Sequence, residues 1–407
     1  MSSNSHNLYT DKLYQSASDS KDLPVPGDIA QQHSEKLIAL IKNEIDNNEG
    51  SISFQRYMEL ALYAPSLGYY AAGSTKLGEE GDFVTAPEIS SLFSQTLANA
   101  ILPALEQVEV ILEVGAGRGR MAADILSYLE QKNKLPKEYW ILELSADLRE
   151  RQKNTIEEIA PELINRVKWI DALPDQFSGI VLANELLDAM PIQLFQKNEN
   201  DISDVDVTWR DEKFSFQLKS SFDERLIIRT KEIESEIGCE LESGYVSEVN
   251  FAAEDWIKSI AERLKQGIVV LIDYGFPRHE YYHAQRSQGT LMCHYRHRTH
   301  PDAFVYPGLQ DITAHVDFTA MADAALEAHM NIIGYTNQVS FLMGAGLLEL
   351  AELNESSDVQ QQMEIATQIK KLTLPHEMGE LFKVIGFSKN CDVLLPAFSF
   401  RDLREYL

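Results

Sequence analysis

The sequence predicts an α/β fold, a doubly wound domain in which helices cover both faces of a mostly parallel β-sheet with an antiparallel edge strand. Two observations predict it. Short runs of Val, Ile and Leu recur between segments with helical spacing, which is typical of parallel strands buried on both faces. A glycine-rich turn follows the first of these runs, as in folds that bind a ligand at the carboxyl edge of the sheet.

The elements of this domain follow one another in a regular order. Strands are predicted at 108–114, 139–144, 167–170, 179–184 and 267–273, with helices after Gly119 and over 147–159. Near the end of the chain, ELFKVIGFSK and DVLLPAFSF predict a terminal antiparallel strand pair at the sheet edge. The core of the domain is therefore expected at residues 108–195, 247–275 and 376–407.

Four segments surround this core. Residues 1–30 are polar and predict a mobile arm. Residues 31–107 predict two helices, a glycine-rich loop at 65–88 and a third helix around 89–105. Residues 196–246 predict an antiparallel insertion, because DVDVTWRDEKFSFQLK and RLIIRTKE both alternate as strands do. Residues 276–375 predict a substrate-side insertion that begins with an aromatic, histidine-rich loop and continues in helices at 317–330, 339–352 and 358–372.

The charge of the chain narrows the classes of partner. Its 407 residues include 63 Asp and Glu against 36 Lys and Arg, which gives a net charge of −27. Such a field opposes nucleic acid and anionic lipid surfaces, whose binding needs Lys and Arg. No run of roughly 18 apolar residues predicts a membrane-spanning helix. Two interpretations of the charge stay open, namely solubility and recognition of a cationic substrate.

Cysteine usage and the amino terminus predict a cytoplasmic protein. Cys239, Cys293 and Cys391 lie far apart and show no CxxC spacing, which fits a reducing compartment. The first residues contain no apolar run of signal-peptide length, and their aspartates argue against a transit peptide.

The glycine-rich turn ILEVGAGRGR carries the strongest chemical signal. Glu113 ends a strand, and Gly115, Gly117 and Gly119 follow it, so that the backbone can approach a ligand closely. A dinucleotide fingerprint needs a third glycine where this chain has Arg120, which disfavours NAD and FAD. The turn suits a cationic ligand without phosphates, and S-adenosyl-L-methionine fits that description.

Two further acids support this interpretation. Glu143 ends the second predicted strand, where an acid can bind both ribose hydroxyls. Asp171 follows the third strand, where it could reach the adenine amino group. The alternative is that Glu113 and Glu143 only cap helices or pair with the arginines of the turn, Arg118 and Arg120.

Eight motifs resemble, in sequence order, the MidA-like family of class I, Rossmann-like methyltransferases. They are ISFQRYMELALYAPSLGYY, GDFVTAPEIS, ILEVGAGRGRMAADIL, LANELLDAMP, DYGFPRHEYY, RSQGTL, PGLQDITAHVDFT and MGELFKVI. The resemblance covers about residues 33–395 and implies the fold, the cofactor and a protein-arginine substrate. It also favours Asp82 and Thr85, on a loop over the cofactor, as binding residues, although Asp82 could instead brace the loop.

An arginine acceptor needs carboxylates that orient its guanidinium. Glu185 is the predicted clamp and Asn184 a pocket-lining hydrogen-bonding residue, on the cofactor as well as the substrate. Asp188 joins them, unless it is a structural cap before Pro191. His315 could accept the arginine proton, and its alternative is a buried histidine bonded to Asp311 or Asp317.

Two classes of function follow from these residues. The first is an S-adenosylmethionine-dependent methyltransferase with a protein partner as substrate. The second is an assembly protein that keeps this fold but acts by binding. Five histidines between 279 and 300 raise the question of a metal, but their loop context and the chemistry of methyl transfer predict none. A homodimer is compatible with the sequence, which gives no oligomeric state.

Overall fold

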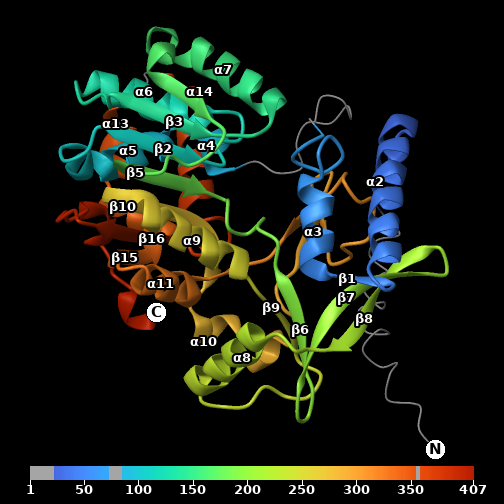
Figure 1. Cartoon of the computed structure of the whole chain (residues 1–407). Helices are drawn as coiled ribbons and strands as arrows, with labels where there is room; N and C mark the ends of the chain where they lie inside the picture. The colour runs from blue at the N-terminus through green and yellow to red at the C-terminus, as the bar shows by residue number, and fades with distance from the viewer. Residues whose placement is uncertain (1–22, 73–84, 354–357) are drawn as a thin grey trace, which may run out of the picture. The chain divides into compact units, whose positions relative to one another are not determined.

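The computed structural model describes residues 23–72, 85–353 and 358–407, and they form two compact units (Figure 1). Unit 1 contains the described residues of Met1–Phe83, Asp188–Ala252 and Arg278–Asp317. Unit 2 contains those of Val84–Leu187, Ala253–Pro277 and Phe318–Leu407. Within the described residues, no helix is long and apolar enough to cross a bilayer.

Unit 2 is built on one twisted sheet with the strand order β15-β16-β10-β5-β2-β3-β4. The strands from β10 to β4 run parallel, and β16 is antiparallel to both β10 and β15. Chain order reverses between β2 and β5. The strand bounds are β2 Val110–Val114, β3 Glu138–Leu142, β4 Val167–Ile170, β5 Phe177–Asn184, β10 Leu264–Phe276, β15 Asn331–Asn337 and β16 Phe382–Lys389. This is the predicted doubly wound α/β sheet, but its antiparallel strand β16 lies between β10 and the edge strand β15, which runs in the same direction as β10.

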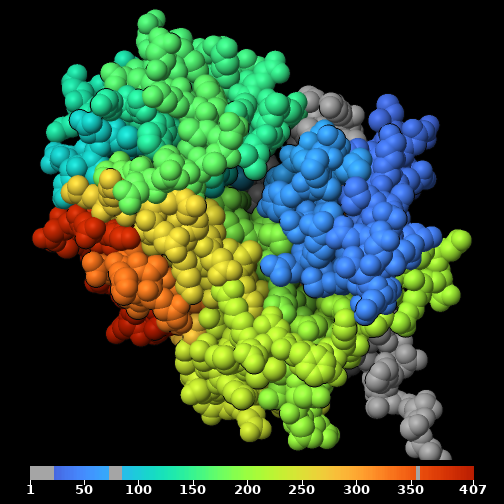
Figure 2. Space-filling model, viewed as in Figure 1, coloured from blue at the N-terminus to red at the C-terminus, as the bar shows by residue number. Residues whose placement is uncertain are grey.

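Helices cover both faces of this sheet. The bounds are α4 Ala86–Ile89, α5 Ser91–Leu105, α6 Arg120–Gln131, α7 Ala146–Ile159, η3 Pro161–Arg166, α9 Phe251–Arg263, α11 Phe318–Glu327, α12 Gln338–Gly344, α13 Leu347–Leu353, α14 Val359–Thr373, η5 Pro396–Phe398 and η6 Arg404–Tyr406. The side chains of α5, α6 and α12 enclose one large core with Ile111 and Ile180 of the sheet. The opposite face carries α9 and α11, whose side chains adjoin on the surface (Figure 2).

Unit 1 contains two antiparallel sheets. In the larger one, β7 pairs with β6 and β1 along one edge and with β8 along the other, and β9 continues beyond β6. The smaller sheet has the order β12-β11-β13. The strand bounds are β1 Ser51–Ser53, β6 Gln193–Lys197, β7 Ile202–Arg210, β8 Lys213–Ser220, β9 Val246–Val249, β11 Met292–Tyr295, β12 Arg298–His300 and β13 Asp311–Thr313.

The helices of unit 1 pack against the larger sheet through apolar stripes. Ile41 of α2 and Tyr57 of α3 share a core with Val207 of β7. Ser53 caps α3 by accepting the N–H of Arg56 at 3.1 Å, as expected for a serine before a helix. The bounds are α2 Asp28–Asn47, α3 Phe54–Tyr63, α8 Glu224–Ile237, α10 Arg278–Tyr281 and η4 Ala284–Arg286.

The predicted strand RLIIRTKE is wrong, because these residues lie on helix α8. The carboxylate of Asp223 caps this helix by accepting the N–H groups of Arg225 and Leu226. Leu226, Thr230 and Ile233 form its buried face with helical spacing. Capping and this spacing outweigh the preference of Ile and Thr for strands.

The second strand of the predicted terminal pair, DVLLPAFSF, is also wrong. Pro396 lacks an N–H for a sheet ladder, and it begins the short 3₁₀-helix η5. Phe398 then packs over Gly334 of β15 and Gly386 of β16, where an added Cβ would meet its ring. The edge position belongs to β15, a strand that the sequence did not predict because the flanking helical patterns obscured it.

Candidate active site

The ends of β3, β2 and β5 bring three predicted site residues into a row. Val114 of β2 is in register with Leu142 of β3 and with Ala183 of β5. Gly115 and Glu143 therefore follow β2 and β3, and Asn184 is the last residue of β5, so all three lie at the carboxyl edge of the sheet. Because chain order reverses between β2 and β5, this row lies at the topological switch point, where open α/β sheets bind their ligands.

The glycine turn after β2 has a left-handed backbone at each of its three glycines, with φ of 76° at Gly115, 50° at Gly117 and 84° at Gly119. At Gly119 an added Cβ would lie 2.9 Å from the Cα atom of Gln152. At Gly117 it would meet no atom of the described residues within 4 Å. The turn therefore packs closely against α7 at one end and leaves open space beside the backbone of Gly117.

Gln152 of α7, which the sequence did not single out, connects the turn to the neighbouring strand. Its side-chain N–H groups donate to the carbonyl of Gly117 at 3.0 Å and to Oε2 of Glu143 at 3.1 Å. Its Oε1 accepts the indole N–H of Trp169 at 2.9 Å. A polar residue four positions before the buried Ile156 was the available signal, since both lie on the inward face of α7.

The carboxylate of Glu143 is held at the end of β3. Besides Gln152, it accepts the backbone N–H of Ser145 at 2.8 Å. The N-cap residue of α7 is Ser145, whose Oγ accepts the N–H of Leu148 at 3.3 Å, so Glu143 holds the capping residue and does not cap the helix itself. Arg120 instead pairs with Asp124 at 2.8 Å.

Glu113 lies inside the sheet rather than on its surface. Its side chain is 0% exposed, and its Oε2 accepts the hydroxyl proton of Tyr139 at 2.6 Å. Among the described residues, its Oε1 has no hydrogen-bond partner. Burial raises the pKa of this carboxyl from 4.5 to about 7, although the bond from Tyr139 works in the opposite direction. In this conformation the side chain of Glu113 is bonded to Tyr139 of β3 and has no exposed surface for a ligand, so its predicted contact with a cofactor stays a prediction.

Asp171 follows β4, as predicted, but its contact is with the protein. Its side chain is 83% exposed and pairs with Arg149 at 2.5 Å. Arg149 also donates to the carbonyl of Glu143 at 2.7 Å. The ion pair thus braces the ends of β3 and β4, and the adenine contact of Asp171 stays a prediction.

The covering loop is described only at its end. Asp82 lies outside the described residues. Thr85 is the N-cap residue of α4, and its carbonyl accepts the N–H groups of Glu88 and Ile89 at 3.0 and 3.1 Å. Its predicted contact with a cofactor stays a prediction.

Glu185 has a left-handed backbone, with φ of 52°, which is rare for a residue other than glycine. Its N–H donates to the carbonyl of Ile272 at 2.9 Å, and its Oε1 accepts the side-chain N–H of Asn184 at 3.0 Å. Asp273, a second residue that the sequence did not single out, accepts the N–H of Leu187 at 2.9 Å. Strained backbone of this kind concentrates at functional sites.

Asp188 and His315 both belong to unit 1, whereas Asn184 and Glu185 belong to unit 2. Within unit 1 they lie near each other, because the carbonyl of Asp188 accepts the N–H of Ala314 at 3.0 Å. The N–H of His315 itself donates to Oγ1 of Thr290 at 2.9 Å. The predicted catalytic set is therefore divided between the two units.

The two acids named as alternative partners of His315 have other contacts. Asp317 pairs with Arg278 at 3.1 Å. Asp311 accepts the hydroxyl proton of Tyr70 at 2.9 Å. Within the part of the chain that is described, no three His, Cys, Asp or Glu side chains are grouped as metal ligands.

The row at the switch point suits a nucleoside that carries positive charge and no phosphate. A ligand can approach the backbone of Gly117 closely. The carboxylate of Glu143, at the end of the next strand, can accept hydrogen bonds from the hydroxyl groups of a ribose. S-adenosyl-L-methionine has these properties, so the residues present fit it.

Comparisons with known proteins agree with this fit. Residues 96–336 match the model of a family described as "Putative S-adenosyl-L-methionine-dependent methyltransferase". A protein from Burkholderia thailandensis, crystallised with S-adenosyl-homocysteine, is 44% identical, with a TM-score of 0.90 over 95% of this chain and 100% of that one. A native structure from the same organism, also 44% identical with the same coverage, superposes with a TM-score of 0.88.

More distant relatives carry a more specific name. The protein arginine methyltransferase NDUFAF7, mitochondrial, of Mus musculus is 28% identical over 82% of this chain and 80% of its own length. The Danio rerio protein of the same name is 27% identical over 82% of each chain. Because these relatives are named mitochondrial, they give no support to the cytoplasmic location that the sequence suggests.

Proposed function

The chain belongs to a family of S-adenosyl-L-methionine-dependent methyltransferases, and we propose that its methyl acceptor is an arginine side chain of a partner protein. One observation carries the proposal. The carboxylate of Glu185, oriented by Asn184, follows the strand next to the glycine turn. The name of the distant relatives supports the same substrate class.

The cofactor supplies a methyl group activated by a sulfonium. We assign its binding to the backbone of Gly115, Gly117 and Gly119, to Asn184, and to Glu143, whose carboxylate is set by Gln152 and Ser145 to receive ribose hydroxyls. Contacts from Asp82, Thr85 and Asp171 are proposed on the sequence alone. The contact of Glu113 is likewise proposed on the sequence alone, since its side chain is buried beside Tyr139.

Glu185 is the proposed clamp of the guanidinium. An arginine side chain is cationic at neutral pH, so a carboxylate can bind two of its N–H groups and hold one nitrogen in line for transfer. Asn184 donates to Oε1 of Glu185 and so restricts the rotation of the carboxylate. The clamp favours the charge that persists on the methylated guanidinium.

His315 is the proposed proton acceptor. The nitrogen that gains a methyl group must lose one proton, and an imidazole titrates in the required range. The backbone of His315 is held in place, because its N–H donates to Oγ1 of Thr290 at 2.9 Å. Asp188 supports this residue through the bond between its carbonyl and Ala314.

The test is methyl transfer from labelled S-adenosylmethionine to the lysate of a strain that lacks this protein. Mass spectrometry of the labelled band should find arginine raised in mass by methyl increments. Glu185→Gln should lower the rate about a hundredfold while cofactor affinity, measured by calorimetry, stays within about twofold, because the substitution removes the charge that holds the acceptor but keeps an oxygen for the bond from Asn184.

Glu158→Gln is the matched control, since Glu158 is exposed on α7, and it should transfer methyl groups like the wild type. Label on another residue type would contradict the arginine proposal. If Glu185→Gln lost transfer but still rescued the phenotype of the deletion strain, the assembly alternative would be favoured.

A further inference from the structure

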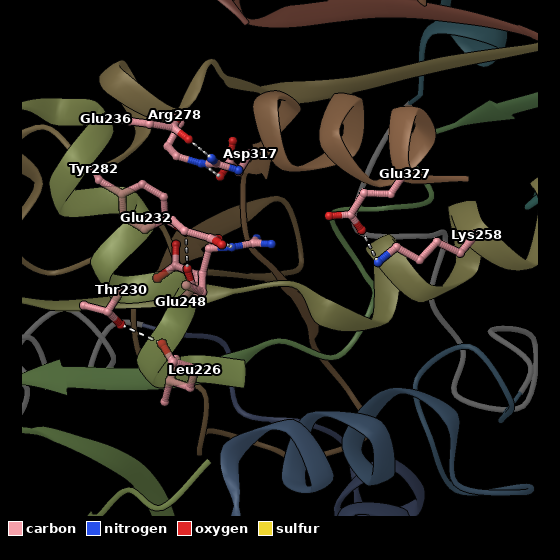
Figure 3. Close-up of polar contacts among 11 residues, drawn as sticks. Leu226, Thr230, Glu232, Glu236, Glu248, Lys258, Arg278, Tyr282, Asp317 and Glu327 are labelled. Carbon is pink, nitrogen blue, oxygen red and sulfur yellow. Dashed lines mark hydrogen bonds and ion pairs between the residues drawn. The ribbon is translucent and has the colours of Figure 1, made fainter. Parts of the chain in front are cut away.

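Glu248 of β9 is a buried carboxylate that the methyl-transfer site does not explain. It is 1% exposed. Its Oε1 accepts the hydroxyl proton of Tyr281 at 2.7 Å, the N–H of Thr290 at 2.8 Å and the hydroxyl proton of Thr290. Figure 3 shows Glu248 beside Tyr282, whose hydroxyl donates to the Glu248 carbonyl at 3.0 Å. Residues from the end of α10 to Thr290 therefore surround the side chain of Glu248.

The motif RSQGTL, residues 286–291, leaves room for the carboxylate of Glu248. The carbonyl of Ser287 accepts the N–H of Val246 at 3.1 Å, so the motif runs beside β9. Gly289 has a φ of 73°, and an added Cβ would lie 2.2 Å from Oε2 of Glu248. A residue with a side chain would displace the carboxylate, so Gly289 and Thr290 together form its receptor.

The same two hydroxyl groups that bind Glu248 also hold the backbone of His315. Oγ1 of Thr290 accepts the His315 N–H at 2.9 Å, and the hydroxyl of Tyr281 lies 3.1 Å from the His315 carbonyl. We propose that Glu248 is a positioning residue, which fixes His315 through Thr290 and Tyr281. The inference rests on the proposed function of His315 as proton acceptor.

The hydroxyl of Tyr281 has one proton for two acceptors. When Glu248 is ionised, that proton lies on the short bond to Oε1. When Oε1 carries a proton, it can donate to the oxygen of Tyr281, and Tyr281 then donates to the His315 carbonyl. The protonation of Glu248 is thereby linked to the way in which His315 is held.

Several groups around Glu248 influence this proton. Burial raises the pKa of Glu248, whereas the bonds from Thr290 and Tyr281 and the charge of Arg286 act to lower it. Tyr245 before β9 and Tyr282 just after α10 also lie near the carboxylate. The neutral form, which leaves Tyr281 free to hold His315, is therefore populated at higher pH than for an ordinary glutamate.

Nuclear magnetic resonance of ring-labelled histidine in the full chain tests the proposal without substrate or cofactor. The resonance of His315, assigned with His315→Gln, should show a second inflection with pH where Glu248 ionises. Glu248→Gln should remove that inflection. Thr290→Val should shift the resonance, and Thr290→Ser, which keeps the hydroxyl, should restore it.

Asp206→Asn is the matched control, because Asp206 is also buried, has a raised pKa and lies on β7 outside this network. It should leave the His315 curve unchanged. Tyr281→Phe, which removes one hydroxyl, provides a milder variant should Glu248→Gln fail to fold. A His315 curve that is the same in the wild type, Thr290→Val and Tyr281→Phe would overturn the proposal.

Kinetics separate this inference from the proposed function. Thr290→Val should lower kcat for methyl transfer by about tenfold to a hundredfold without changing cofactor affinity, because a displaced base loses its alignment. If the resonance changes as expected but His315→Gln transfers methyl groups normally, the positioning stands and the role of His315 as proton acceptor is wrong.

Discussion

Left-handed backbone at the carboxyl edge of unit 2 distinguishes its site residues from the rest of the sheet. Gly115, Gly117, Gly119 and Glu185 all have positive φ. At the glycines this conformation costs little, and it lets the backbone open towards a ligand. At Glu185 it costs about 1 kcal/mol or more, which the bonds to Ile272 and Asn184 help to offset.

We expect Gly119→Ala to destabilise the cofactor-free protein by about 2–4 kcal/mol, since left-handed strain adds to a contact with the backbone of Gln152. Gly117→Ala has similar strain but no contact with the part of the chain that the structure describes, and should cost only about 1 kcal/mol. Urea unfolding of both variants checks the difference. Equal losses would show that the approach of α7 to the turn does not matter.

The buried carboxyl of Glu113 makes stability depend on pH. Its pKa is raised by burial from 4.5 to about 7, so in this window the folded protein keeps a proton that the unfolded chain has lost. Stability is therefore present below pH 4.5 and falls as pH rises to 7, by roughly 3 kcal/mol in total.

Glu113→Gln cannot ionise and should not show this loss. The unfolding free energy of the wild type, relative to this variant, should therefore fall between pH 4.5 and 7.5 in urea titrations. Glu158→Gln, on the exposed surface of α7, should follow the wild type at every pH. A constant difference between the wild type and Glu113→Gln would contradict the raised pKa.

At the scale of elements, one side chain of α7 connects several parts of the site. Gln152 joins the glycine turn, the carboxylate of Glu143 and the indole of Trp169. The sequence predicted the helix from its spacing but not this role, because the partners of a buried amide come from three different elements. Local patterns give the type of an element, and they leave its side-chain contacts to the tertiary structure.

Helix α8 shows how a cap decides the type of an element. Asp223→Ala removes an acceptor for two N–H groups at its first turn and should cost about 1 kcal/mol. Thermal unfolding measures this loss, with the exposed neighbour Glu224→Ala as the control, for which we expect less than about 0.5 kcal/mol. A loss no larger than that of the control would contradict the capping role of Asp223.

At the scale of the whole molecule, one buried ion pair joins the first and last residues of a long segment. Arg278 and Asp317 are the two ends of the third segment of unit 1, and they lie together in Figure 3. Arg278 is 2% exposed and pairs with Asp317 at 3.1 Å and with Glu236 at 2.5 Å. Lys258 and Glu327, in the same figure, form an exposed pair between α9 and α11 at 2.7 Å.

Arg278→Met should cost about 3–5 kcal/mol, because it leaves Asp317 buried without its cation. Lys258→Met should cost about 0–1 kcal/mol, since solvent screens that pair. Denaturant unfolding of the two variants gives the comparison. Similar values for both would mean that Asp317 finds solvent or another partner once Arg278 is lost.

Only some of the acidic residues that the sequence predicted at the site, within its net charge of −27, lie together there. Glu143 and Glu185 lie at the switch point, but Glu113 is inside the sheet and Asp171 pairs with Arg149. The acids that the sequence predicted as one group thus have different surroundings. Their shared sign was visible in the sequence, whereas their exposure and partners were not.

The sequence by itself determined the doubly wound sheet, the glycine turn after its first strand and the cofactor class. It could do so because strand periodicity and left-handed glycines are local properties of the chain. Only the tertiary structure decided that Gln152 and Asp273 brace the site and that Glu248 holds the backbone of His315. These roles depend on contacts between residues far apart in the sequence, which burial and strand register create and no local pattern contains.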